Sequence, residues 1–319
     1  MAFSRRKREQ RQQEIAQASG HAVLSGHVQA SRGLQIAFKA FLLFSVGIGL
    51  AMMVTLIVKA LIDGWPRLNL DLITGFPSAL PENAGLQSAI VGSIYLMIGV
   101  AVITLPLAVG AALYLEEYAD KRRWWNKIIE VNIQNLAAVP SIVFGILGLA
   151  FIVRGPLSLG SVLLAGSLTL SLMVLPTVIL ASREAVRAVP DSIREAAYGL
   201  GATQWQTIRL QVLPASIPGI ATGMILALSR AIGETAPLLL VGGVTFITFN
   251  PDITPENWLG FNSSFTALPL TIFNYLTRPQ EEFRTLAAAG VIVLLVVLLA
   301  MNSIAIYIRN RYRKRLEQN

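Results

Sequence analysis

The sequence predicts an all-α integral membrane protein with six transmembrane helices. Hydrophobic residues make up 54% of the chain, charged residues only 14%, and the mean hydropathy is +0.60. A chain this apolar does not fold as an ordinary soluble domain. Six apolar segments are also long enough to cross a hydrocarbon core of about 30 Å at a rise of about 1.5 Å per residue. Composition and segment length therefore lead to the same fold class.

The six expected spans differ in how regular they are. They cover residues 38–62, 88–115, 131–153, 158–182, 215–243 and 285–308. The first and the last are uninterrupted apolar runs, whereas those between contain Pro106, Pro140, Pro176 and Pro237. Membrane helices tolerate proline where neighbouring helices satisfy the freed backbone groups. We therefore expect the four middle spans to be buried in a bundle.

Basic residues are distributed unequally between the two sets of loops. The N-terminal tail, the 116–130 loop, the 183–213 loop and the C-terminal tail together hold 20 Lys and Arg residues, whereas the opposite loops hold five. Loops rich in Lys and Arg stay in the cytoplasm. The bias predicts that both termini are cytoplasmic, with residues 1–37 and 309–319 as basic tails. It leaves Arg230 as the only basic residue inside a span.

The N-terminal tail and the two long loops on the opposite side of the membrane differ in composition. The N-terminal tail has no apolar stretch before residue 38, so it does not resemble a cleaved signal peptide. It is either a solvated segment that fixes topology or a basic helix on an anionic lipid surface. The loops at 63–86 and 244–283 are rich in Pro, Asn and aromatic residues. The longer one could form a docking surface for a partner that delivers solute.

Missing residue types exclude several kinds of chemistry. The chain has no cysteine, and its two histidines, His21 and His27, cannot form a metal site alone. It has no G-x-x-x-x-G-K-[ST] loop, so we expect ATP and Mg²⁺ to be bound by another polypeptide, and no cofactor in this one. The net charge is +8, and the basic residues lie mainly in the loops of one membrane side. This distribution favours a lipid bilayer over nucleic acid as the partner.

The 183–213 loop has the pattern of two short helices joined by a turn. Asp191 or Ser192 can cap a first helix, and Gly199 and Gly201 can end it. Thr203 can then begin a second helix, which leads into the fifth span. The pattern predicts a compact helical hairpin rather than a disordered loop.

The order of residues in this loop, EAAYGLGATQWQTIRLQVLP, resembles the EAA loop of ABC importer permeases. The residues that match the pattern are Glu195, Ala196, Ala197, Gly201, Leu213 and Pro214. Gln211 stands where the pattern has an apolar residue, so we expect a small rotation of the last turn. The resemblance implies a type I ABC importer transmembrane domain, with a permease core over 88–308 after a first span at 38–62. It also implies that 183–213 is a coupling loop that docks on an ATP-binding subunit. The alternative is a hairpin that only packs on its own bundle.

Four further stretches extend the resemblance: LAVGAALYLEEYA, NIQNLAAVPSIVFGILGLAFIVR, ALSRAIGETAPLLLVGG and FTALPLTIFNYLTRPQEEF. Over roughly residues 38–315 the chain is similar to the permease subunits of phosphate-specific ABC importers, more to the PstA group than to PstC. The resemblance implies a non-catalytic subunit of the bacterial inner membrane that imports inorganic phosphate. It also implies three partners: a PstC-like second permease, a dimer of ATP-binding subunits and an extracytoplasmic phosphate-binding protein.

Arg230 and Glu234 form the candidate substrate site. They are four residues apart, which places them on one face of a helix. An arginine at the centre of a bilayer costs about 2.5 to 3.5 kcal/mol on insertion scales, so such residues usually face the bundle interior or a water-filled path. The guanidinium suits phosphate oxygens, and the carboxylate can moderate its hold on the anion. The alternative is an internal salt bridge that fixes helix packing.

Other polar residues of the spans carry weaker predictions. Thr235 and Asn135 are secondary candidates for the substrate path, but helix hydroxyls often bond their own backbone and amides often join helices. Glu116, Glu117 and Asp120 are most simply a solvated helix end.

Three functional classes remain after this reading. The leading one is a permease subunit for phosphate, with another oxyanion such as molybdate or sulfate as the alternative substrate. The second is an ion-coupled secondary transporter with Glu234 as a proton site, for which we find no second copy of SRAIGET in the other half of the chain. The third is a membrane enzyme. The sequence argues against it, because it has no nucleophile or metal-ligand cluster near Arg230.

Overall fold

The computed structural model describes residues 32–120, 122–252 and 254–317, with the side chains of residues 35–311 among them. Most of the predicted basic tail at 1–37 lies outside the described residues. Within them the chain is helical and has no β-strand. Five described helices are long and apolar enough to cross a membrane, and a bent pair of helices forms a sixth candidate span. These findings confirm the predicted fold class.

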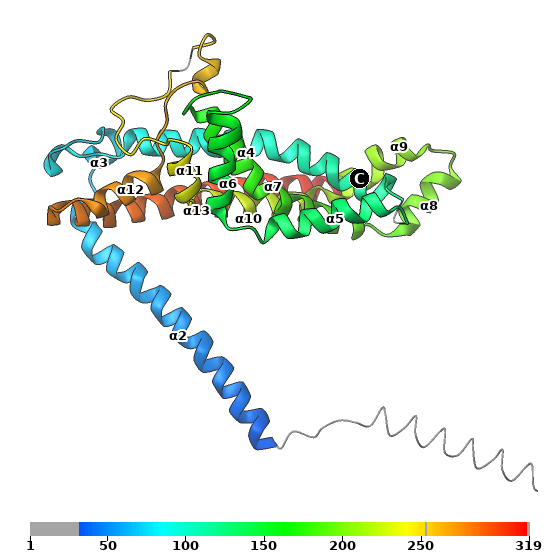
Figure 1. Cartoon of the computed structure of the whole chain (residues 1–319). Helices are drawn as coiled ribbons and strands as arrows, with labels where there is room; N and C mark the ends of the chain where they lie inside the picture. Colours follow the sequence, from blue (N-terminus) through cyan, green and yellow to red (C-terminus); the bar gives the residue numbers. More distant parts are fainter. Residues whose placement is uncertain (1–31, 121, 253, 318–319) are drawn as a thin grey trace, which may run out of the picture. The chain divides into compact units, whose positions relative to one another are not determined.

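The chain divides into two compact units, residues 1–58 and 59–319. The helix α2 (Arg32–Gly64) begins in the first unit, and the other described helices lie in the second (Figure 1). The long helices of the second unit are α4 (Gln87–Leu113), α7 (Leu163–Arg187), α10 (Leu213–Ala231) and α13 (Glu281–Glu317). The shorter elements are η1 (Trp65–Arg67), α3 (Leu70–Thr74), η2 (Pro81–Asn83), η3 (Tyr114–Tyr118), α5 (Trp124–Ala137), α6 (Ser141–Leu147), η4 (Gly148–Val153), α8 (Asp191–Gly199), α9 (Gln204–Thr207), η5 (Ile208–Val212), α11 (Ala236–Leu240), η6 (Trp258–Gly260) and α12 (Leu268–Thr277).

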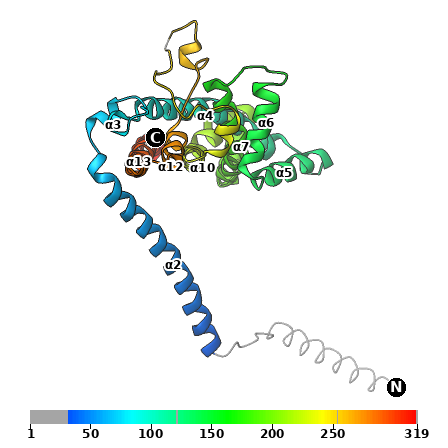
Figure 2. The same ribbon diagram turned by 60° about the vertical axis from the view of Figure 1, so that its left-hand side comes forward.

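Among the described helices, α4 and α7 pack together most extensively. Both views draw them close to each other (Figures 1 and 2). Gly99 of α4 lies against Ser167 of α7, and Glu116 just after α4 meets Arg183 of α7. Because both positions advance together along the chain, the two helices are parallel. Parallel neighbours need a crossover connection, which α5 and α6 supply.

Helix α10 packs against α7 in the opposite direction through small residues. Gly219 lies on Ala185, and Gly223 lies on Ala181. A methyl group added at either glycine would overlap the Cβ atom of the facing alanine. Helices in a bilayer gain little from hydrophobic burial against each other, so close backbone approach through small residues drives their association.

The third expected span, 131–153, is not one straight helix. It consists of α5 and α6, with η4 following α6, and the pair is bent by 109° at a short break. Pro140 lies in that break. Proline has no backbone N–H and disfavours helical conformation in the residue before it, which explains the bend.

The fifth expected span, 215–243, has different limits in the structure. A continuous helix begins at Gln204, passes through η5 into α10 and ends at Ala231. The chain then leaves the helix and forms α11 after a break at 232–235. Pro237 blocks the helical hydrogen bond to residue 233, and Gly233 is a poor helix former, so the break has a local cause.

Helix α7 also differs from the expected 158–182 span, because it begins at Leu163 and continues to Arg187. Arg183 and Arg187 therefore belong to a candidate membrane helix. The prediction that Arg230 is the only basic residue inside a span is wrong. Hydropathy ends the expected span at residue 182, just before the first charged residue. In the structure Arg183 and Arg187 are paired with Glu116, and α7 continues to Arg187.

Candidate functional site

The hairpin of α8 and α9 lies at one end of the bundle (Figure 1). Pro190 occupies the N-cap position of α8, so the predicted cap by Asp191 or Ser192 is wrong. Proline fits there because its φ is preset and its missing N–H has no partner at a helix start. Asp191 lies instead in the first turn, where a negative charge favours the helix.

The turn of the hairpin depends on Gly201. Its φ is +82°, a left-handed conformation that favours glycine. The Gly201 N–H donates to the carbonyl of Tyr198 at 2.9 Å, and the Ala202 N–H donates to the carbonyl of Ala197 at 3.1 Å. This pair of bonds is the Schellman motif that ends many helices. Gly199 is the last helical residue and Gly201 has the left-handed conformation, so α8 ends at these two glycines, as the sequence predicts.

The second helix begins at Thr203, as the sequence predicts. The Gln206 N–H donates to the Thr203 hydroxyl at 3.3 Å, and the Thr203 N–H donates to the Gln206 side chain at 2.8 Å. This capping box satisfies two N–H groups at the helix start. Because the helix continues from there to Ala231, the half-buried residues Leu213 and Pro214 lie inside one long helix.

The last turn before α10 is irregular at Gln211, where the sequence predicts a small rotation. Residues 208–212 form a π turn, in which one residue more than usual is fitted into the helix. The polar Gln211 is exposed there, and the apolar Val212 is completely buried.

The hairpin exposes an apolar surface. Exposed fractions reach 44% for Tyr198, 90% for Leu200, 56% for Trp205 and 64% for Leu210. The motif residues Glu195 and Ala196 are exposed beside them, and Ala197 is half-buried. Several large apolar side chains exposed on one short hairpin are typical of a protein interaction site.

Buried ion pairs surround η3, where the sequence predicts a solvated helix end. We call this region, formed by Glu116 and Glu117 with their arginine partners, the base of the hairpin. The Glu116 carboxylate in η3 lies 2.8 Å from Nη2 of Arg183 and 2.7 Å from Nη2 of Arg187, both on α7. Arg183 also lies 3.0 Å from Glu130 of α5. The side chains of Glu116 and Arg183 expose only 4% and 6%. The prediction of a solvated end is therefore wrong for Glu116, because partners distant in sequence enclose it.

Glu117, the next residue of η3, is bound by the hairpin itself. Its Oε1 accepts hydrogen bonds from Nε of Arg194 at 3.2 Å and from Nη2 at 2.8 Å. Its backbone carbonyl accepts a hydrogen bond from the Gln204 side chain at 2.6 Å. The Glu117 side chain exposes only 7%. Arg194 and Gln204 carry no sequence signal for this role, because their partner is more than 70 residues away.

Arg230 and Glu234 meet, but not along a helix face. Arg230 is in the last turn of α10, and Glu234 lies beyond the helix end. The Arg230 Nε atom is 3.6 Å from Oε1 of Glu234. The Arg230 side chain exposes 49%, and within the described residues it donates no hydrogen bond. Its guanidinium therefore retains donors for a further anion.

The secondary candidates lie apart from one another. Thr235 precedes α11 and makes no side-chain cap. Asn135 is exposed near the end of α5, and in the described part of the chain no hydrogen bond joins it to Arg230 or Glu234. Ser229 beside the pair bonds the Ile225 carbonyl and Asn302 of α13, which is a packing contact.

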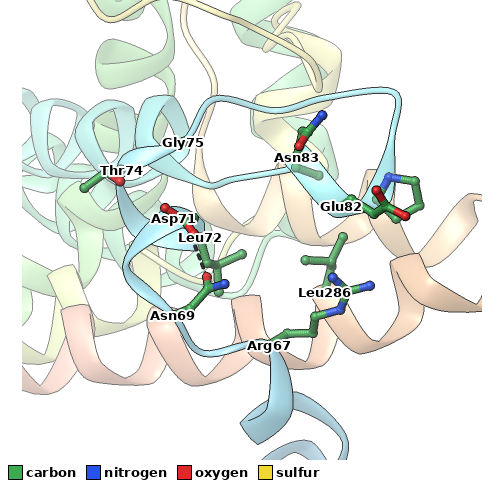
Figure 3. A pocket seen from close by; sticks show the side chains of 11 residues that line it. Arg67, Asn69, Asp71, Leu72, Thr74, Gly75, Glu82, Asn83 and Leu286 are labelled. Carbon is green, nitrogen blue, oxygen red and sulfur yellow. Dashed lines mark hydrogen bonds between the residues drawn. The ribbon is translucent and has the colours of Figure 1, made fainter.

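A polar cavity of about 280 Å³ lies at the opposite end of the bundle from the hairpin. Figure 3 shows Arg67, Asp71 and Glu82 around it, with Asn69 accepting a hydrogen bond from the Leu72 N–H. The cavity is formed mainly by the 63–86 loop and contains none of the predicted site residues.

Comparison with known families identifies the class of protein. Residues 104–314 match the model of the binding-protein-dependent transport system inner membrane component. The chain belongs to this family. It is therefore a multi-pass inner membrane component of an ABC importer, as the EAA-loop resemblance implies.

Individual relatives agree with this assignment. The chain is 33% identical to the phosphate transport system permease protein PstA of Yersinia pestis, over 81% of this chain and 83% of that protein. It is 30% identical to the probable ABC transporter permease protein YqgI of Bacillus subtilis, over 84% of this chain and 92% of that protein. Its fold is similar to a chain of the inward-facing MetNI methionine ABC transporter, with a TM-score of 0.52, 16% identity, and coverage of 72% of this chain and 94% of that one.

Proposed function

We propose that this chain is a permease subunit of an ATP-driven importer of inorganic phosphate. The observation that carries the proposal is the likeness to permeases named for phosphate transport over four fifths of the chain. The state of Arg230 supports it, because a half-exposed guanidinium with unused donors suits the oxygens of a tetrahedral oxyanion.

Arg230 and Glu234 together would bind phosphate weakly enough to release it again. A guanidinium alone can hold phosphate through two parallel hydrogen bonds. Glu234 lies close enough to compete for the same charge and reduce the affinity. The break between α10 and α11 lies next to the pair, and broken membrane helices often line binding sites in transporters. Thr235 and Asn135 would line the passage at either side.

The hairpin would couple this chain to a dimer of ATP-binding subunits. Glu195, Ala196 and Ala197 would enter a cleft of that subunit, and the exposed apolar residues would surround them. Gly201 would shape the turn, and Leu213 with Pro214 would carry the movement into α10. This orientation puts the hairpin and both termini in the cytoplasm. A PstC-like second permease and a phosphate-binding protein on the opposite side would complete the transporter.

Uptake of radiolabelled phosphate into proteoliposomes tests this function. The chain is reconstituted with its second permease, with and without the ATP-binding subunit, and the binding protein is supplied from the other side. We expect uptake that requires ATP, resists ionophores and is not reduced by excess sulfate or molybdate. Stronger competition by sulfate or molybdate would assign another oxyanion, and uptake driven by an ion gradient without ATP would indicate a secondary transporter.

A further inference from the structure

The ion pair of Glu117 and Arg194 connects the hairpin to the end of α4, a helix to which the hairpin has no direct chain connection. Residues 188–190 join α8 to α7, and η5 joins α9 to α10. Helix α4 has no covalent neighbour in the hairpin. Glu117 in η3, directly after α4, provides polar contacts with the hairpin, because both Arg194 of α8 and Gln204 of α9 bind it.

Arg194 uses its whole guanidinium in this position. Besides its two bonds to Glu117, its Nη1 donates to the carbonyl of Val189 at 2.7 Å and to Asp191 at 3.1 Å. Its Nη2 also donates to the carbonyl of Val186, in the last turn of α7, at 3.1 Å. The hydrogen bond with Glu117 raises the pKa of Arg194, so the side chain stays charged. A lysine could not reach these acceptors at once, because it has one donor atom.

Apolar contacts fill the space below this pair. Val186, Val189 and Val212 form a small buried cluster, with Leu113 of α4 and Ile193 of α8 packed against it. Residues from α4, α7, α8 and η5 therefore meet at one point. Arg194 and Glu117 fix their relative positions through directional bonds, which apolar packing alone does not provide.

We propose that Arg194 and Glu117 are the positioning pair that transmits movement of the hairpin to α4, so that α8 and the ends of the parallel helices α4 and α7 move as one body. This inference rests on the proposed function, in which an ATP-binding subunit moves the hairpin. Neither residue touches the substrate. Their loss should separate ATP hydrolysis from transport.

The test measures ATP hydrolysis and phosphate uptake in the same proteoliposomes. The variants are Arg194→Gln, Glu117→Gln and the double substitution. Arg209→Gln is the matched control, because Arg209 is an exposed arginine of η5, directly after the hairpin, and makes no ion pair or side-chain hydrogen bond within the described residues. We expect phosphate imported per ATP to fall about 10-fold in each single variant, which is a typical size for coupling between sites. The double variant should be no worse than the singles, since both remove one interaction. Arg194→Lys should be intermediate.

A second measurement does not depend on transport. The chain has no cysteine, so Ser192→Cys and Val102→Cys can be introduced and spin-labelled at exposed positions of α8 and α4. We expect one narrow distance distribution in the otherwise unchanged chain and a broader one with Arg194→Gln. This comparison remains informative if a variant does not assemble or if the wild-type transporter does not import phosphate, an outcome that would refute only the proposed function.

Two results would overturn the inference. One is an unchanged ratio of phosphate to ATP in both single variants. The other is a distance distribution as narrow with Arg194→Gln as without it.

Discussion

The two groups of charged residues in this chain differ in how completely they are satisfied. At the base of the hairpin, Glu116, Arg183 and Glu117 are almost fully buried, and their contacts are as short as 2.7 to 3.0 Å. At the end of α10, Arg230 and Glu234 are 3.6 Å apart, and Arg230 is half exposed. The first group spends its hydrogen-bonding capacity inside the chain and organises it. In the second group, the Arg230 guanidinium keeps hydrogen-bond donors for a ligand outside the chain.

We therefore expect substitutions in the first group to reduce stability, and substitutions in the second group to reduce transport with little change in stability. Breaking a buried pair leaves an uncompensated charge and costs about 3 to 5 kcal/mol, whereas an exposed pair contributes about 0 to 1 kcal/mol. Four substitutions test the comparison, in order of their expected effect on the stability of the chain.

Arg183→Met should have the largest effect. It removes one partner of the buried Glu116, which keeps Arg187, so we expect a loss at the lower end of this range, about 3 kcal/mol. Denaturant-induced unfolding of the purified chain in micelles measures this loss. Arg187→Met is the matched control, since Arg187 is 49% exposed and Glu116 would keep Arg183. Equal losses for the two variants would contradict the distinction between them.

Gly201→Val should have the next largest effect. A β-branched residue in a left-handed conformation costs about 1 to 2 kcal/mol. The strain should distort the hairpin while the chain still inserts, so that the complex with the ATP-binding subunit becomes uncoupled or dissociates. Co-purification and phosphate-stimulated ATP hydrolysis measure this. Gly199→Val has no such strain, because Gly199 is helical, and should be tolerated better. An intact and fully coupled complex from the Gly201 variant would be evidence against the role of the turn.

Arg230→Gln should change stability by no more than about 1 kcal/mol, because the pair that it breaks is long and Arg230 is half exposed. Phosphate uptake should nevertheless be lost, since the amide lacks the charge and the fork of donors. Uptake and unfolding are measured on the same preparation. Normal uptake would reduce Arg230 to a packing role.

Glu234→Gln should have the smallest effect on stability, again below about 1 kcal/mol. Without the competing carboxylate, Arg230 should hold phosphate longer. We expect a lower maximal rate of uptake together with an unchanged or lower KM, measured from initial rates. A raised KM would indicate that Glu234 supports binding rather than release.

Hydropathy and local motifs predicted the features that depend on neighbouring residues. The all-α class, the start of the second hairpin helix at Thr203 and the encounter of Arg230 with Glu234 all depend on residues within one or two turns. Gly233 and Pro237 likewise indicate a loosened helix at 232–235, although hydropathy joins the apolar runs on both sides into one expected span.

The ion pairs at the base of the hairpin could not be predicted in the same way. Glu116 meets Arg183 across 67 residues, and Glu117 meets Arg194 across 77. These encounters depend on α4 and α7 being parallel, which the crossover through α5 and α6 determines. A charge at the end of a span has the same local pattern whether it is solvated or paired with a distant residue.

The π turn η5 sets the angular phase between the hairpin and the helix that carries Arg230. An ideal α-helix advances by about 100° for each residue, so one residue added or removed turns everything beyond it by that angle. Deleting a single residue from 208–212 would leave both segments chemically unchanged but would rotate the side chains of α10 away from their present neighbours. In this helix, a change in length of one residue is therefore a rotation of Arg230 about the helix axis.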